Sequence, residues 1–209
     1  MNSTYNSIEK AFYSDGFKLG MKALDSENQE EAIYNVIAEM YKTIDNLIDS
    51  LTVFAQQQSQ AIDCKKGCFW CCHQPVFALD YELDFLKKYI TEKFPKEKQV
   101  IVQERAKEKT RKLDGLKEDD LLNSKHPCPL IEDGSCSAYE ARPMACRIYL
   151  STNLISCLKF FENPEDKNNY PNLLELPMRA GRLMNEGFKS ALKTKGYKTE
   201  EYRIEEKLS

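Results

Sequence analysis

The chain has 209 residues, 42% of them hydrophobic and 30% charged, which is ordinary for a soluble globular protein of one domain or one domain with an extension. Its formal net charge is −3, and this argues against a dedicated nucleic-acid binder, whose surface usually carries a basic excess. No basic run followed by an apolar segment opens the sequence, and no uncharged stretch is long enough to cross a membrane. We therefore expect a cytoplasmic protein that has no nucleic-acid or membrane partner.

Two helices are predicted at the start of the chain. The first covers residues 4–24, with Ile8, Phe12 and Phe17 as scattered apolar positions. The second runs from Gln29 to Gln58 and carries an apolar seam with a repeating four-three spacing. The seam consists of Ile33, Ile37, Met40, Ile44, Leu47, Leu51 and Phe54. We expect it to pack within the chain against the first helix; a homodimer or a partner-protein contact is the alternative.

Shorter elements are predicted in the middle of the chain. Residues 75–79 favour an extended segment, after which Asp80 is expected to be the N-cap of a helix that Pro95 ends. Residues 96–113 are dominated by charged side chains and predict a solvated helix, with the face formed by residues 103–112 in water. Asp133-Gly134, between two short apolar runs, predicts a β-hairpin within residues 128–139.

The last part of the chain predicts one more helix. Pro164 and Pro171 mark an irregular connection, and a final helix is expected over residues 176–193. The last dozen residues are charged and are expected to fray. The expected fold is therefore mainly α, with a long N-terminal helix pair over residues 1–60 and a cysteine-cluster metal-binding domain over residues 61–209 that includes one short β-hairpin.

Eight cysteines are the most informative feature of the sequence. Structural disulfides are rare in a reducing compartment, so clustered cysteines there indicate metal or redox chemistry. Thiolates two or three residues apart can surround one soft metal ion or one face of a cluster. We therefore predict an iron–sulfur cluster or zinc, with these candidate ligands: Cys64, Cys68, Cys71, Cys72, Cys128, Cys136, Cys146 and Cys157.

The number of metal sites stays open at this point. Successive side chains such as Cys71 and Cys72 tend to point apart, so eight thiols suit two four-cysteine sites, or equally one site with several reserve thiols. Buried reduced cysteine is the simpler explanation for Cys157. His73 and His126 lie close to cysteines, but a surface role or a supporting role behind the ligands is the more ordinary expectation for each of them.

The ordered pattern of these residues resembles a known family. It reads Cys64-x-x-Gly67-Cys68-x-x-Cys71-Cys72, then Cys128-Pro129-Leu130, then Gly134-x-Cys136-x-x-Tyr139-x-x-Arg142-Pro143-x-x-Cys146-Arg147. This looks like the CxxCxxCC family of zinc- or iron-chelating cysteine-cluster proteins, over about residues 64–157. One departure is that three residues, not two, separate Cys64 from Cys68. The resemblance implies metal binding, and some proteins with this cluster are flagellin lysine methylases, which are larger.

Several functions compete on this evidence. The first is a metal-binding protein with a structural, storage, redox or electron-transfer role, in which Arg142 and Arg147 support the thiolates, although Arg147 could equally pair with a carboxylate. The second is a radical S-adenosylmethionine-type or protein-methylase-like enzyme, because Cys64, Cys68 and Cys71 have a suitable spacing. That enzyme needs alternating strands and helices, which the sequence does not predict. A thiol oxidoreductase using Cys71 and Cys72 and a helical interaction protein are further alternatives, so whether the chain is an enzyme stays open.

Overall fold

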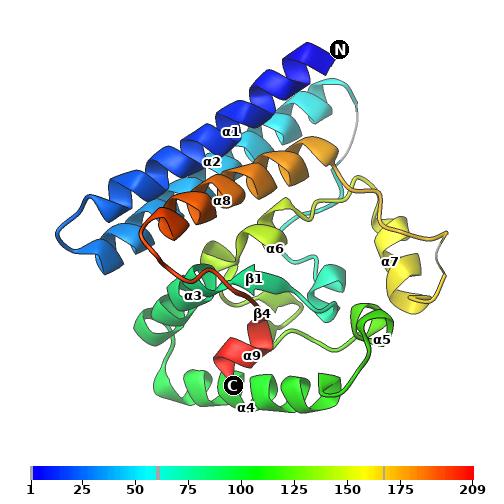
Figure 1. Ribbon diagram of the computed structural model, residues 1–209. Coiled ribbons are helices and arrows are strands. Elements are labelled where there is room, and N and C mark those ends of the chain that lie inside the picture. The colour runs from blue at the N-terminus through cyan, green and yellow to red at the C-terminus, as the bar shows by residue number, and fades with distance from the viewer. Residues whose placement is uncertain (1, 60–61, 167) are drawn as a thin grey trace.

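Three long helices lie side by side in the computed structural model, which describes residues 2–59, 62–166 and 168–209. They are α1 (Asn2–Leu24), α2 (Gln29–Gln57) and α8 (Glu175–Thr194), and they form one layer of the molecule (Figure 1). The predicted N-terminal helix pair is confirmed. However, the main neighbour of α1 is α8, which comes from the far end of the sequence. The predicted pair of helices is therefore part of a three-helix bundle.

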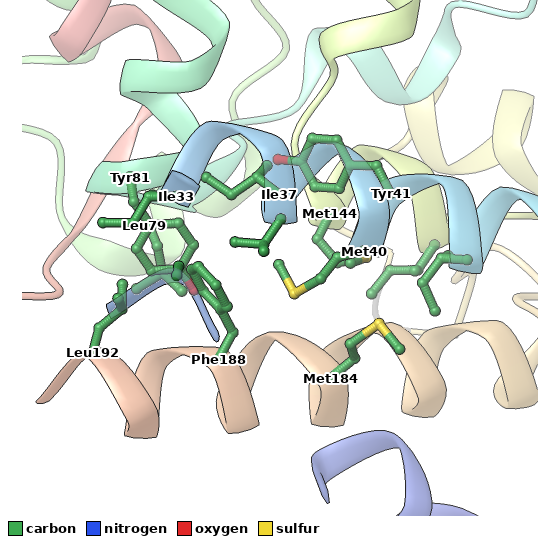
Figure 2. Packing of buried hydrophobic residues seen from close by; sticks show 14 of the residues in the cluster. Ile33, Ile37, Met40, Tyr41, Leu79, Tyr81, Met144, Met184, Phe188 and Leu192 are labelled. Atoms are coloured by element: carbon green, nitrogen blue, oxygen red, sulfur yellow. The ribbon is translucent and has the colours of Figure 1, made fainter. Parts of the chain in front are cut away.

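The apolar seam of α2 explains why the bundle forms. Asn28 caps this helix by accepting a hydrogen bond from the backbone N–H of Glu31 at 3.3 Å. The first four seam residues, from Ile33 to Ile44, are buried and pack against Met184 and Phe188 of α8 (Figure 2). The seam therefore packs within the chain. Its distal end is different, since Phe54 is 59% exposed.

Glycine allows α1 and α8 to approach closely. A Cβ atom added to Gly16 would lie 1.9 Å from the carbonyl oxygen of Met184, and one added to Gly187 would lie 2.0 Å from that of Tyr13. Both distances are far below van der Waals contact, so the two backbones touch where neither helix carries a side chain. This close approach was not visible in the sequence, because it joins residues that are about 170 positions apart.

The remaining elements are shorter. The other helices are α3 (Asp80–Lys93), α4 (Lys96–Leu113), α5 (Glu118–Asn123), α6 (Met144–Ile148), α7 (Leu154–Glu162) and α9 (Ile204–Leu208), with single 3₁₀ turns η1 (Trp70–His73) and η2 (Tyr139–Ala141). Two antiparallel strand pairs accompany them: β1 (Phe77–Leu79) with β4 (Glu201–Arg203), and β2 (Ile131–Glu132) with β3 (Ser135–Cys136). The mainly α fold and its short hairpin are confirmed.

The C-terminal segment is ordered, which corrects the expectation that it frays. β4 pairs with β1 in the register Phe77↔Arg203, and α9 packs on α4 with Ile204 and Leu208 buried (Figure 1). One face of α4 is buried as well, so the 103–112 segment is not wholly solvated: Ala106 and Lys109 lie inside. The charged sequence of α4 thus contains a narrow apolar stripe, which α9 covers.

The start of α3 also differs from the prediction. Asp80 is the first helical residue, and its carboxylate accepts from the N–H of Tyr81 at 2.8 Å. Glu82 accepts from the N–H of Leu79 at 3.2 Å, but it is only 1% exposed and does more than cap the helix. It also accepts hydrogen bonds from Tyr41 of α2, from Asn185 of α8 and from the N–H of Met144, which begins α6. Glu82 therefore joins the bundle to the helix that carries Cys146.

Two further expectations concern membranes and domains. In the described ranges no helix is both long and apolar enough to cross a membrane. The predicted domain boundary between residues 60 and 61 lies outside the described residues. The division into regions 1–60 and 61–209 therefore stays a prediction.

Candidate metal centre

The first cysteine region is a tight loop that ends in the 3₁₀ turn η1. Gly67 has φ +95°, a conformation that L side chains rarely adopt, and the N–H of Cys68 binds the carbonyl of Lys65 at 3.0 Å. The N–H of Cys72 then binds the carbonyl of Phe69 at 3.0 Å. Gly67 therefore supplies the backbone conformation on which the turn between Cys64 and Cys68 depends.

The second cysteine region is built on the predicted hairpin. Asp133 (φ 48°) and Gly134 (φ 72°) make its turn, and Cys136 lies opposite Ile131 in the strand register. The N–H of Ile131 binds the carbonyl of Cys128 at 3.0 Å. Cys128 and Cys136 are therefore held on neighbouring segments of one small β unit.

Backbone hydrogen bonds bring the two regions together. The N–H of Cys128 binds the carbonyl of Cys72 at 2.8 Å, and the N–H of His126 binds the carbonyl of His73 at 2.9 Å. Cys146 follows on α6, where its N–H binds the carbonyl of Pro143 at 3.0 Å. Together with Cys128 and Cys136, it packs against a hydrophobic core made mainly by α3, α4 and α9.

Seven cysteines line a single cavity of about 180 Å³, far above the roughly 10–15 Å³ that one water molecule needs. Besides these cysteines the wall includes Tyr139, Arg142 and Ile204. In the described part of the chain, no three Cys, His, Asp or Glu side chains converge closely enough to hold a metal ion as they stand. The seven cysteines are Cys64, Cys68, Cys71, Cys72, Cys128, Cys136 and Cys146. The donors thus surround a space and do not meet at a point.

Cys157 lies apart from this set, on α7. It lines a second, much smaller cavity of about 10 Å³, which Cys64, Cys68 and Cys71 also line. The start of α7 is tied to the first cysteine loop, because the N–H of Leu154 binds the carboxylate of Asp63 at 2.8 Å. Cys157 is therefore close to the first cysteine region and not to the hairpin.

Burial favours the protonated form of most of these thiols. It raises the pKa of Cys64, Cys68, Cys136 and Cys146, and it raises the pKa of Cys128 to about 12. The pKa of Cys72 is raised first by a hydrogen bond with the Cys71 thiol and then by burial. Because a metal binds the thiolate form, metal binding at this cavity has to release protons.

Arg142 is a cation in the cavity wall, and its charge favours the thiolate form of the cysteines. Its guanidinium lies 3.8 Å from the centre of the Tyr139 ring, and its buried Nε has no hydrogen-bond partner. Its charge lowers the pKa values of Cys72, Cys136 and Cys146, against the effect of burial. A buried N–H donor without a partner costs about 1–3 kcal/mol. The site is therefore arranged to receive an anionic group, as metal-bound thiolates are.

Arg147 has a different role from Arg142. It is only 2% exposed, and it binds the carbonyls of Arg142 and Glu140 and forms an ion pair with Asp45 of α2. Its guanidinium also lies 4.1 Å from the centre of the Tyr41 ring. Of the two roles expected for Arg147, the structure shows pairing with a carboxylate. This pairing fixes the segment around Cys146 from behind.

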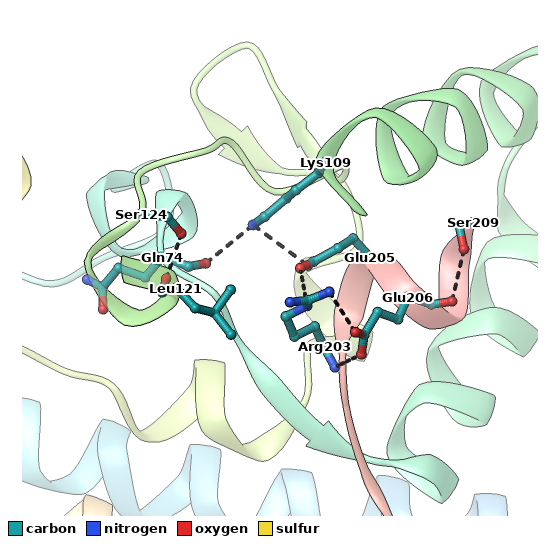
Figure 3. A network of polar contacts seen from close by, with 8 residues as sticks. All are labelled: Gln74, Lys109, Leu121, Ser124, Arg203, Glu205, Glu206 and Ser209. Atoms are coloured by element: carbon teal, nitrogen blue, oxygen red, sulfur yellow. Dashed lines mark hydrogen bonds and ion pairs between the residues drawn. The ribbon is translucent and has the colours of Figure 1, made fainter. Parts of the chain in front are cut away.

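Lys109 is a supporting residue that the sequence analysis missed. It is 4% exposed, and its Nζ lies 3.4 Å from the carbonyl of Gln74 and 3.7 Å from the carboxylate of Glu205 (Figure 3). Arg203 faces Glu205 at 3.1 Å from the same C-terminal segment. Lys109 therefore anchors the end of the first cysteine loop to α4 and α9. The four-three-four spacing of Val102, Ala106, Lys109 and Leu113 was the signal for this buried face.

Neither histidine lines the main cavity. His73 Nδ1 lies 3.2 Å from the carbonyl of Phe69, and its ring packs 5.0 Å from the ring of Phe161. His126 joins the region through its backbone, and burial lowers the pKa of its side chain. Their positions agree with the supporting roles expected for them.

Comparison with known proteins identifies the family of this chain. A search of curated proteins and a search of solved structures found no match. The sequence model of the CxxCxxCC family, described as a putative zinc- or iron-chelating domain, matches residues 63–172, which is more than half of the chain and contains all eight cysteines. The residues that surround the cavity therefore carry the pattern that defines the match, and the chain belongs to the CxxCxxCC family.

Proposed function

We propose that the chain holds an iron–sulfur cluster in the main cavity and serves in electron transfer. The observation that carries this proposal is the convergence of thiols from two distant parts of the sequence on one cavity of about 180 Å³. The family description supports metal binding in general, by zinc or by iron.

The arrangement of the donors favours a cluster over a single ion. Four thiolates on one zinc ion all lie about 2.3 Å from one point. The thiolates of an iron–sulfur cluster bind irons at the edge of a group of several atoms, and so they stand farther apart. The cavity that the cysteines line has a volume of about 180 Å³, which suits the larger group.

The wall of the cavity suits an anionic centre. Cys72, Cys128, Cys136 and Cys146 would hold the cluster, and the cluster would supply one-electron chemistry there. Arg142 brings a positive charge and an unpartnered N–H to the same cavity. Hydrogen-bond donors placed behind thiolate ligands stabilise their negative charge and adjust the reduction potential of the metal centre.

Electron transfer suits the position of the cavity. Residues 65–67 of the first cysteine loop are exposed, so a centre behind them would lie near the surface and within reach of a redox partner. A radical S-adenosylmethionine barrel would need a parallel sheet, and the strands within the described residues are only short antiparallel pairs. No observation favours that second function.

Elemental analysis and visible absorption on protein purified without oxygen test this proposal. We expect iron, acid-labile sulfide and a brown colour. Zinc without colour would overturn the cluster and leave a structural metal site. Neither metal in a folded sample, even after reconstitution, would overturn metal binding itself.

A matched pair of variants locates the site. Cys136→Ser removes one wall thiol, and Ser135→Ala changes the neighbouring residue of the same strand, which does not line the cavity. We expect the first variant to lose most of the cluster absorption and the second to keep it. Equal absorption in both variants would remove Cys136 from the ligand set.

A further inference from the structure

Seven of the eight cysteines line the main cavity, and three of these line the small cavity as well, together with Cys157. Resting on the proposed metal binding, we propose that the chain holds two separate four-cysteine metal centres. The inner centre uses Cys72, Cys128, Cys136 and Cys146, and the outer centre uses Cys64, Cys68, Cys71 and Cys157. The two centres meet at the Cys71–Cys72 peptide bond.

The two cavities give the first argument. The four inner cysteines line the main cavity only, and Cys157 lines the small cavity only. Cys64, Cys68 and Cys71 line both, so they form the wall between the two spaces. The small cavity, at about 10 Å³, is comparable with the space for one water molecule, which suits a single metal ion.

The backbone of the inner group forms one connected unit. Cys128 binds the carbonyl of Cys72, and Ile131, whose N–H binds the carbonyl of Cys128, lies opposite Cys136 in the hairpin. Cys146 packs on the same core as Cys128 and Cys136. These links fix the four inner cysteines relative to one another.

The outer group is tied together by a separate set of contacts. The N–H of Cys64 binds the carbonyl of Ser151 at 3.2 Å, and its thiol donates to the carbonyl of Tyr149 at 3.8 Å. Asp63 accepts from the N–H of Leu154, which is the first residue of α7. The first cysteine loop is thereby docked onto the segment that leads to Cys157.

The vicinal pair explains how one short loop serves both groups. Cys71 and Cys72 lie in η1, and their thiols are hydrogen-bonded to each other, so this pair stands where the two groups adjoin. Cys72 faces only the main cavity, whereas Cys71 also faces the small one that Cys157 lines. Two adjacent cysteines are redundant in a single four-ligand site, but each has a separate task when two sites adjoin.

The stoichiometry agrees with this division. A closed zinc site and a typical iron–sulfur cluster each take four cysteines, and the chain has eight. Each cysteine sulfur turns about a single side-chain bond between staggered positions. The thiols of each group can therefore close on a metal by rotation of the side chain, with the backbone held in place by the hydrogen bonds described above.

Single substitutions in the full chain test the two-centre proposal. Wild type and variants are purified without oxygen, supplied with iron, sulfide and zinc, and analysed for metal per folded chain and by visible and electron paramagnetic resonance spectra. We expect Cys157→Ser to lose one centre and keep the signature of the other, and Cys146→Ser to do the reverse. The double variant loses both centres.

The adjacent pair provides the sharpest comparison. Cys71→Ser should match Cys157→Ser, and Cys72→Ser should match Cys146→Ser, although the two residues are neighbours. If any of these variants fails to fold, as judged by circular dichroism, Cys64→Ser replaces it for the outer centre and Cys136→Ser for the inner one.

Each outcome has a definite meaning. Loss of all metal from both Cys157→Ser and Cys146→Ser would show one shared centre and overturn this proposal, while the proposed function would stand. Full metal content in Cys157→Ser would remove Cys157 from the ligands and also overturn it. Folded wild type that takes up no metal would instead overturn the proposed function itself.

Discussion

The helical bundle and the cysteine-bearing half of this protein are held together by different means. The bundle is made of three long helices with a continuous apolar interior, and long helices of this kind need no further support (Figure 2). The segments that carry the cysteines are short turns, two-residue strands and helices of only five to nine residues, and they line a cavity beside a second core made mainly by α3, α4 and α9. The difference indicates that the bundle is stabilised by burial of apolar side chains along its whole length, whereas the cysteine-bearing segments depend on their contacts with this second core, on polar anchors and on a bound metal.

Two polar anchors connect the two regions, and a third lies within the cysteine half. Glu82 joins α2, α8 and the start of α6, and Arg147 is held by Asp45 of α2. Lys109 joins α4, the C-terminal segment and the loop after the first cysteines. The bundle thus acts as a rigid support, and the anchors transmit its order to the segments that carry thiols.

Removal of the metal should give the largest difference in local stability between the two regions. Structural zinc contributes apparent binding energies of about 10–16 kcal/mol in small domains, so loss of the metal should destabilise the short segments that carry the cysteines. We expect chelation to raise hydrogen exchange in residues 64–73 and 126–157, measured by mass spectrometry, while α2 stays protected over residues 33–44. Equal loss of protection in α2 would mean that the two regions unfold as one unit.

Truncation of a core side chain in the bundle tests whether a weaker bundle leaves the metal site intact. Phe188 is fully buried between the helices, so Phe188→Ala should lower the free energy of unfolding by about 3–5 kcal/mol. The exposed Phe54→Ala is the control and should stay within about 0.5 kcal/mol of wild type. Denaturant unfolding gives both values. Metal per folded chain should not change, and a selective loss of metal in Phe188→Ala would contradict the division between the regions.

Lys109→Met should have an intermediate effect, confined to the cysteine half. It leaves the carbonyl of Gln74 without its donor, while Arg203 still faces Glu205, so we expect a loss of about 2–3 kcal/mol. Lys107→Met, at an exposed position of the same helix, is the control. Faster release of metal to a competing chelator should accompany the loss of stability. Unchanged release would limit Lys109 to a role in packing.

Arg142→Gln should have the smallest effect on stability and a specific effect on the site. Loss of a supporting donor typically weakens metal binding about 10–100-fold, and a tenfold change corresponds to about 1.4 kcal/mol. Competition with a chelator and the reduction potential of the centre both measure this effect. Arg142→Lys keeps the charge but loses the planar stacking on Tyr139, so it should recover only part of the affinity. Wild-type values in both variants would exclude Arg142 from the site.

Several features of the fold could be predicted because they depend on local patterns. The seam from Ile33 to Ile44 has helical spacing, and the Asp133-Gly134 turn requires the two positive φ angles that the structure contains. Each of these follows from residues that are neighbours in the sequence.

The errors occurred where a distant segment changed the environment of a residue. Lys109 belongs to a charged run, and only α9 makes its face an interior one. The last dozen residues carry a charged composition that predicted fraying, yet pairing with β1 orders them. Propensity and composition describe an isolated segment, so they give no information about a packing partner that is more than 90 residues away in the sequence.

The chemistry of this protein can be read from its sequence: which residues are thiols, how closely they are spaced, and that the chain carries a cysteine-cluster pattern. The folded structure was needed to show which thiols share a cavity, that Arg142 lines this cavity and Arg147 does not, and that Cys157 joins the first loop through α7. The reason is physical. Ligand type is a property of single residues, whereas the grouping of ligands depends on hydrogen bonds and packing between segments that meet only when the chain has folded.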